Sequence, residues 1–269
     1  MSNEIAKAEP KKDLTFGAYM TSTGIKNRIN QVIGSEKDGK RFISSIVSAV
    51  STNPALAECD NGSIVSAALL GESLKLSPSP QLGNYYLVPY NDKNKGKVAQ
   101  FQLGYKGYIQ LAIRSGQYKK LNVLAIKEGE LIKYDPLNEE IDVQLIDDEL
   151  KREKAKTIGY YAMFEYVNGF RKSIYWSKEK MEAHALQYSQ GYRAKKGYTF
   201  WEKDFDSMAF KTMLRQLISK WGIMSIDLQQ AYESDMAVIN EDGSKEYVDN
   251  YTEAEFVEEE PKKVSLDEV

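Results

Sequence analysis

The stretch FQLGYKGYIQLAIRSGQYKK, residues 101–120, changes from the spacing of a strand to the spacing of a helix within a few residues. Ala99, Phe101 and Leu103 alternate with Gln100 and Gln102, which is typical of a strand with one apolar and one polar face. We expect the two glutamines to lie on an exposed face of a sheet. A fold that combines strands and helices follows from this segment.

The helix expected from Tyr105 to Ser115 has two distinct faces. Lys106, Gln110 and Arg114 recur every four residues and share one polar stripe. The residues expected to turn inward are Ile109, Ala112 and Ile113. The whole stretch contains no Asp or Glu, and its basic side chains are Lys106, Arg114, Lys119 and Lys120. A basic stripe with neighbouring tyrosines is therefore a candidate surface for a polyanion.

Further strands are expected on both sides of this unit. Asn168-Gly169 separates two aromatic-rich runs, and this dipeptide suits the type I′ turn of a hairpin. The other candidates are short apolar or alternating runs, namely NYYLVPY (84–90), VAQFQL (98–103) and LNVLAIK (121–127). The sequence thus predicts a mostly antiparallel sheet of at least four strands.

Helices are expected before and after these strands. Apolar residues from Phe42 to Val50 follow helical spacing, and a second helix is expected to begin at an N-cap, Ser63. The last third contains KEKMEAHALQYSQ (178–190) and the long pattern FWEKDFDSMAFKTMLRQLISKWG (200–222), with Gly222 as its C-cap. The predicted fold class is α+β. We divide the chain into a flexible N-terminal arm (1–25), a core (26–230) and an acidic tail or small module (231–269).

Charge is distributed unevenly along the chain. The net charge is −3, but residues 231–269 hold 13 Asp/Glu and 3 Lys/Arg, a net of −10. Residues 1–230 therefore carry 33 basic and 26 acidic groups, a net of +7. Residues 93–127 contain eight Lys/Arg and no acid. A local field of this kind is the electrostatic signature of a nucleic-acid binder, although charged stripes on helices are more often simply solvated.

Several other classes of function lack their sequence signals. No apolar run is long enough for a membrane-spanning helix and no signal peptide is recognisable, so a cytoplasmic protein is expected. One cysteine, Cys59, and one histidine, His184, exclude a Cys/His zinc cluster, and His184 is expected to be a surface or packing residue. The segment LGYKG lacks the spacing of a phosphate-binding loop. We expect no cofactor, no metal and no catalytic site.

Three motifs in order, LGNYYLVPY, QLGYKGYIQLAIRSG and WEKDFDSMAFKTMLRQL, resemble the RecT family of phage single-strand annealing proteins over residues 25–230. The resemblance implies a mixed α/β annealing fold and homologous pairing without ATP. One DNA strand would be held by its backbone while a complementary strand anneals to it on an oligomeric ring or filament. The implied partners are single-stranded DNA and annealed duplex, other copies of the chain, a phage exonuclease and a host single-strand binding protein, in a bacterial host cell.

The resemblance also assigns DNA-binding residues. The basic pairing region of the family matches Tyr105, Lys106 and Arg114, and its C-terminal basic helix matches Lys211 and Arg215. From the residues alone, we expect the four cations of this set to have no neighbouring acid to pair with, apart from partial neutralisation of the long helix by Asp204 and Asp206. Ile113 and Gln216 stand where relatives often have a second arginine, so the affinity per monomer is expected to depend instead on Lys97, Lys119, Lys120 or Arg193. The wider expected single-strand site comprises Lys97, Gln100, Gln102, Tyr105, Lys106, Arg114, Arg193, Lys211 and Arg215, with Lys119 and Lys120 as further candidates.

Two alternatives stay open from the residues alone. A protein that coats single strands without annealing them would use the same basic surface. Acid pairs such as Glu202 with Asp206, or Asp147 with Asp148, are ligands of the type that Mg²⁺ takes in a nuclease, but helix-start charge and solvation explain them better. The acidic tail is expected to compete for the basic surface, to recruit a partner, or only to solubilise the chain.

Overall fold

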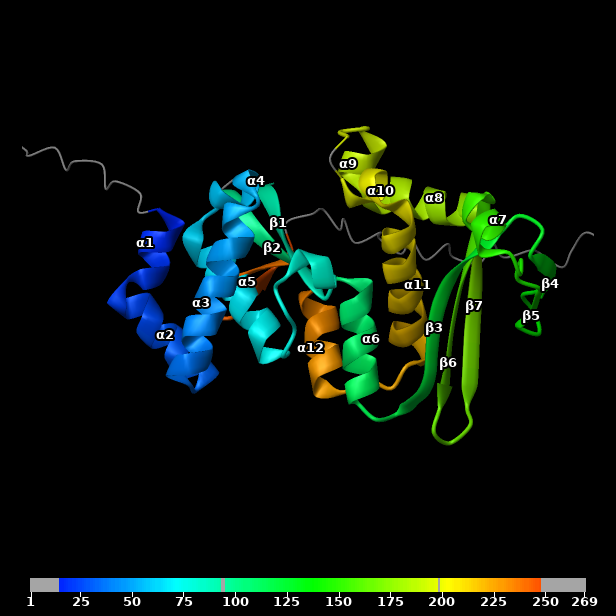
Figure 1. Ribbon diagram of the computed structural model, residues 1–269, viewed down its shortest axis with the longest axis horizontal. Helices are drawn as coiled ribbons and strands as arrows, with labels where there is room; N and C mark the ends of the chain where they lie inside the picture. Colours follow the sequence, from blue (N-terminus) through cyan, green and yellow to red (C-terminus); the bar gives the residue numbers. More distant parts are fainter. Residues whose placement is uncertain (1–14, 93–94, 198, 248–269) are drawn as a thin grey trace, which may run out of the picture.

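A computed structural model describes residues 15–92, 95–197 and 199–247 of the chain. These residues form 12 α-helices and antiparallel sheets of four, three and two strands, which confirms the α+β class. Figure 1 shows an elongated molecule, with the first helices at one end and the two-stranded sheet at the other. No helix within these residues is long and apolar enough to span a membrane.

The first part of the chain packs helices onto the four-stranded sheet. Its strands follow the order β1 (Tyr85–Asp92), β2 (Gly96–Leu103), β8 (Ala237–Ile239) and β9 (Lys245–Glu246). The helices before them are α1 (Phe16–Thr21), α2 (Thr23–Ile33), α3 (Glu36–Ser51), α4 (Pro54–Ala57) and α5 (Asn61–Ser73), and a 3-10 turn at Pro80–Leu82 leads into β1. The C-terminal strands β8 and β9 thus complete a sheet begun some 140 residues earlier, as the pairing of Gln100 with Val238 shows.

The second part is built on the three-stranded sheet, β3 (Tyr118–Lys127), β6 (Thr157–Tyr166) and β7 (Arg171–Ser177). The helices α8 (Lys178–Tyr188) and α11 (Phe205–Trp221) pack on it, and the short helices α9 (Gln190–Arg193) and α10 (Phe200–Lys203) connect them. A separate hairpin of β4 (Leu131–Asp135) and β5 (Glu140–Val143), followed by α7 (Glu149–Lys154), lies beside β7.

The two parts share one core through α6 (Tyr105–Arg114) and α12 (Ile226–Ser234). Tyr85 and Phe101 of the first sheet stack with ring centroids 5.1 Å apart in the same buried cluster as Leu214 and Ile218 of α11. Figure 1 shows α12, α6 and α11 side by side in the middle of the molecule. Because this cluster is continuous, α6 is held rigidly against both parts.

Two glycines allow α6 to begin very close to the loop before β1. A Cβ atom on Gly104 would lie 2.1 Å from the carbonyl oxygen of Gly83, and one on Gly107 would lie 2.1 Å from that of Asn84. Real Cβ atoms do not approach other atoms so closely, so only glycine fits at either position. These glycines therefore serve packing, and they fix the first turn of α6 beside β1.

Several local predictions are confirmed and others are wrong in detail. The stripe Phe42, Ile46 and Val50 is buried in α3, and Gly222 is the C-cap of α11. The N-cap of α5 is Asp60 and not Ser63, because its carboxylate accepts from Ser63 N at 2.7 Å. The Asn168-Gly169 hairpin is present, but positive φ occurs at Gly169 and not at Asn168, so the turn is not type I′.

The ends of the predicted domains lie partly outside the described residues. Of the expected N-terminal arm, residues 15–25 contain α1 and the start of α2, and Phe16 and Met20 are buried. Residues 231–247 of the expected acidic tail contain the end of α12 and the strands β8 and β9. The arm before residue 15 and the tail after residue 247 fall outside the described residues, and with them most of the tail's acids.

Candidate nucleic-acid interface

Lys106 lies in the first turn of α6, where a helix attracts negative charge. The N-cap is Gly104, which has no side chain to cap the helix, and the first turn contains no acid. Lys106 is exposed, and no carboxylate among the described residues forms an ion pair with it. Backbone N–H groups of a first helical turn and a lysine together favour an anion such as phosphate.

Two tyrosines lie near this lysine, and a phenylalanine lies beside one of them. Lys106 Nζ is 5.9 Å from the centre of the Tyr105 ring. Gly83 brings Tyr86 and Lys106 together, since a Cβ there would lie 3.2 Å from Tyr86 Oη and 3.3 Å from Lys106 Cδ. The ring of Tyr86 lies 5.3 Å from the ring of Phe200 on α10. Phe200 itself is 38% exposed. Burial raises the pKa of Tyr86, and the adjacent Tyr105 phenol and Asp204 carboxylate raise it further. We call Tyr86, Tyr105, Lys106 and Phe200 the Lys106 surface.

The sequence did not identify Tyr86 or Phe200 as part of this surface. Tyr86 was visible only as one of two consecutive tyrosines in a strand, and alternation indicates merely that it points away from the buried Tyr85. The sequence pattern of residues 200–222 predicts one long helix, which would contain Phe200 together with Lys211 and Arg215. The structure ends α10 at Lys203 and begins α11 at Phe205, with Asp204 as the N-cap of α11. This break turns Phe200 toward β1.

Arg114, at the other end of α6, is exposed but engaged. Its guanidinium donates to Leu74 O at 2.8 Å, to Lys75 O at 2.7 Å and to Gln110 Oε1 at 3.0 Å. These carbonyls belong to the end of α5, so Arg114 caps that helix and ties α6 to it. Ile113 was predicted to face inward, but it is 62% exposed. The other two inward residues are confirmed, because Ala112 is buried and the half-buried Ile109 packs against the core; Tyr108 and Leu111 complete the buried face of α6.

The prediction that Gln100 lies on an exposed strand face is wrong. Gln100 is 1% exposed and donates through Nε2 to Met236 O at 2.6 Å. Gln102, which is half-buried, donates in turn to Gln100 Oε1 at 2.8 Å. Because β8 pairs with β2, Met236, the residue before β8, lies beside Gln100, and its carbonyl accepts the hydrogen bond from the Gln100 amide. Both amides are therefore occupied in joining the C-terminal segment to β2.

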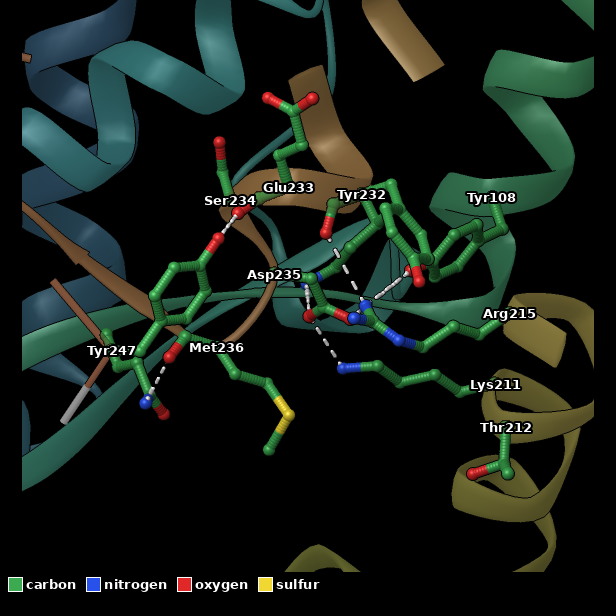
Figure 2. A network of polar contacts seen from close by, with 12 residues as sticks. Tyr108, Lys211, Thr212, Arg215, Tyr232, Glu233, Ser234, Asp235, Met236 and Tyr247 are labelled. Atoms are coloured by element: carbon green, nitrogen blue, oxygen red, sulfur yellow. Dashed lines mark hydrogen bonds and ion pairs between the residues drawn. The ribbon is translucent and has the colours of Figure 1, made fainter. Parts of the chain in front are cut away.

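Lys211 and Arg215 are not part of an exposed ridge, because a buried acid pairs with both of them. Lys211 Nζ and Arg215 Nη1 each lie 2.8 Å from a carboxylate oxygen of Asp235, whose side chain is fully buried. Figure 2 shows the three side chains converging from α11 and from the segment after α12. The expectation that these two cations have no neighbouring acid is thus wrong.

Asp235 is satisfied on both oxygens. Leu103 N donates to Oδ1 at 2.9 Å, and the Tyr108 hydroxyl, 3.3 Å from Oδ2, also donates to it. Burial lowers the pKa of Lys211, while the charge of Asp235 acts in the opposite direction. Burial also works against the charged form of Arg215, but Tyr108 and Asp235 hold its pKa above the usual range. We call Tyr108, Lys211, Arg215 and Asp235 the buried ion network; it joins β2, α6, α11 and the C-terminal segment.

The remaining predicted cations are scattered. Lys97 forms an ion pair with Glu58, and Lys119 and Lys120 both pair with Glu165, at 2.7 and 3.6 Å. Arg193 is exposed at the end of α9, which Figure 1 places above α11. Within the described residues, no group of three or more His, Cys, Asp or Glu side chains could hold a metal ion. The structure therefore brings together Tyr105 and Lys106, but not the whole predicted set.

His184 is a packing residue with a low pKa. Its ring lies between Trp176, at 5.5 Å, and Tyr188, at 4.5 Å, and burial, with a smaller contribution from Arg215, lowers its pKa to about 4. Between pH 6.5 and 4 the unfolded chain binds a proton that the folded protein excludes, so the free energy of unfolding should fall as pH decreases. Allowing for solvent screening, we expect the free energy of unfolding to fall by roughly 1–2 kcal/mol between pH 6.5 and 4. The variant His184→Asn should not show this decrease. Nuclear magnetic resonance should show the His184 midpoint near 4, and a midpoint near 6.5 would contradict this burial.

Comparison with known proteins gives consistent relatives. The model of the RecT family matches residues 40–250. The chain is 41% identical over 250 residues to the uncharacterized protein YqaK of Bacillus subtilis (strain 168), covering 92% of this chain and 80% of that one. It is 28% identical over 221 residues to the protein RecT of Escherichia coli (strain K12), covering 81% of this chain and 79% of that one. The chain belongs to the RecT family.

Proposed function

We propose that the protein anneals complementary single strands of DNA without ATP, and that the Lys106 surface holds one strand. Membership of the RecT family supports single-strand annealing in recombination. The observation that carries the site is the exposed Lys106 beside Tyr105 and Tyr86, in a first turn of α6 that contains no acid, with Phe200 next to Tyr86. Nonspecific single-strand binding commonly combines cations for the backbone with aromatic faces for the bases.

Each group has a distinct task in this proposal. Lys106 and the first N–H groups of α6 neutralise a phosphate, and release of counterions makes the binding depend on salt. Phe200 or Tyr86 stacks on a base, which is worth about 1–3 kcal/mol and does not depend on sequence. Arg114 lies two helical turns from Lys106, about 12 Å along α6, and approaches the strand with the N–H groups left over from capping α5. Bases outside the stacking contact stay open for pairing.

The buried ion network supports the surface without touching DNA. Lys211 and Arg215 hold α11 against α6 and β2 through Asp235 and Tyr108, and Gln100 and Gln102 join β2 to the C-terminal segment. Their part in the proposal is to fix the position of Lys106 and Tyr105. Arg193 and Lys97 are both exposed, and in this proposal they make outer contacts that increase the number of nucleotides bound by one subunit.

Assembly and partners complete the proposal. Annealing two long strands requires many short sites in a row, so we propose that copies of the chain form a ring or a filament. A nuclease that exposes single strands and a host single-strand binding protein would act before this step, in the cytoplasm of a bacterial host. These partners follow from the resemblance to the family.

One experiment tests the function against its two alternatives. Two complementary labelled oligonucleotides are mixed with the protein, without ATP and with or without Mg²⁺, while duplex formation and strand length are followed together. We expect faster duplex formation and intact strands under both conditions. Slower duplex formation would identify a coating protein, and Mg²⁺-dependent shortening would identify a nuclease.

A further inference from the structure

Residues 128–156 form an acidic protrusion on a basic body. They contain ten Asp/Glu and five Lys/Arg, a net of −5, and comprise β4, β5 and α7. Figure 1 shows them at one end of the long axis, beyond β7. Neither the Lys106 surface nor the buried ion network includes any of them. This protrusion is therefore a part of the molecule that the proposed DNA site leaves without a role.

The protrusion is attached rigidly. Glu130, whose side chain is fully buried, accepts from Lys127 N at 2.7 Å, from Ile146 N at 3.1 Å and from Arg152 Nε at 2.6 Å. A second attachment joins the hairpin to β7, where Glu139 pairs with Lys172 and the Tyr134 ring lies 4.9 Å from that of Tyr175. A module held at its base and at its hairpin keeps a defined direction.

Its outer side presents apolar side chains that the chain itself leaves uncovered. Leu137 is 88% exposed at the tip of the hairpin, and Leu150 on α7 is 69% exposed. Leu137 is held in place because Asp135 Oδ1 accepts from Leu137 N at 2.9 Å and from Asn138 N at 3.2 Å. Other large apolar side chains exposed here are Ile132, Tyr134 and Leu145. A single exposed leucine would need no explanation, but five large exposed apolar side chains on one rigidly attached module offer apolar area that a docked partner would cover.

The opposite end of the molecule has the complementary character. Residues 23–51, in α2 and α3, contain five Lys/Arg and two Asp/Glu, a net of +3. A hollow of about 290 Å³ between these helices is lined by Lys26, Asn30, Glu36, Lys40, Ile43 and Ser44, a net charge of +1. Lys40 Nζ lies 2.8 Å from the Glu36 carboxylate, so Lys26 is the lysine of the hollow without an ion pair among the described residues. Val32 on α2 is a further exposed apolar side chain, at 54%. Figure 1 places α2 and α3 at the far end from β4 and β5.

We infer that the acidic protrusion of one copy docks on the basic hollow of α2 and α3 of the next copy. The charges are opposite, both surfaces carry exposed apolar side chains, and they lie at opposite ends of the long axis. A contact between two different surfaces is heterologous, so each end of a pair keeps one unused surface and further subunits add in a row, which closes as a ring or stays open as a filament. This inference rests on the proposed function in one respect, because it names the contact that builds the proposed assembly.

Charge reversal at each end tests the contact. One variant carries Asp142→Lys and Glu153→Lys, two exposed acids of the protrusion, and the other carries Lys26→Glu and Lys40→Glu. Like charges facing each other weaken a contact strongly, so each variant alone should associate at least about tenfold more weakly than the unmodified protein. Sedimentation velocity of the full chain with a single-stranded oligonucleotide measures this. Leu137→Asp should act in the same direction without changing the basic end.

Mixing the two charge-reversed variants gives the decisive result. The lysines of one protrusion then face the glutamates of the other hollow, and the unchanged pair of surfaces also matches, so equal amounts should assemble again. The inference would be overturned if each variant assembled on its own, or if the mixture failed to assemble. It would also be overturned if the unmodified protein were monomeric.

The same variants separate this inference from the proposed function. Each should bind a short oligonucleotide as the unmodified protein does, because the Lys106 surface is unchanged. Loss of assembly with retained short-strand binding supports the contact. If the unmodified protein assembles but does not speed annealing, the proposed function fails while the contact stands.

Discussion

Asp235→Asn should lower the free energy of unfolding by about 3–5 kcal/mol, the cost of removing one partner from a buried ion pair. The substitution keeps the shape of the side chain but leaves Lys211, at 8% side-chain exposure, and the partly buried Arg215 without their shared carboxylate. Burial alone already disfavours the charged form of Lys211. Urea unfolding followed by circular dichroism measures the effect.

A matched control separates this result from any loss of negative charge. Asp147→Asn removes the same charge from an exposed position in the loop before α7, and it should change stability by less than about 0.5 kcal/mol. Equal stability of the two variants would show that the network does not hold the fold together. Lys211→Ala combined with Arg215→Ala should also destabilise, since Asp235 is then buried without a cation. A loss of DNA binding in that double variant would therefore reflect lost stability first, and it would not by itself show that the two cations contact DNA.

Lys106→Ala should weaken binding of single-stranded DNA roughly tenfold, while the fold stays intact. The side chain is exposed, so its removal costs little stability, but one phosphate contact is lost. Because a single strand releases about 0.7 counterion per contact, the slope of log affinity against log salt should also decrease by about 0.7. Fluorescence anisotropy at several salt concentrations measures both quantities.

Lys220→Ala is the matched control for this second experiment. Lys220 is an exposed lysine at the far end of α11, away from the Lys106 surface. Its loss lowers the net charge equally, so an equal decrease in affinity for both variants would assign the binding to the overall charge. A change restricted to Lys106→Ala supports the surface, and Phe200→Ala should then weaken binding without changing the salt slope.

Local patterns predicted the elements of this fold well. The hairpin around Asn168-Gly169, the α3 stripe and the change from β2 to α6 depend on neighbours close in sequence, so periodicity and turn residues identify them. The two-stranded sheet was missed, because β4 and β5 are short and largely exposed and show no clear apolar alternation. The strands β8 and β9 were missed for a different reason, because they complete a sheet whose other strands are far away in sequence.

The candidate site was predicted less well, because burial of charge depends on distant partners. Lys106 and Tyr105 lie where the pattern of α6 suggested, beside each other on one surface. Lys211 and Arg215 have the same helical spacing as an exposed ridge, and only the position of Asp235, 24 residues beyond Lys211, shows that they are buried. Spacing along one helix reveals which residues share a face but not what covers that face.

The late position of Asp235 has a consequence for synthesis. A ribosome makes Lys211 and Arg215 before the carboxylate that neutralises them, and it makes β2 long before β8 can pair beside it. Until residue 235 has emerged, α11 cannot be buried against α6 without leaving two cations unpaired. The nascent chain therefore cannot close its central core before Asp235 is made, and α6 obtains its final support only after that residue has emerged.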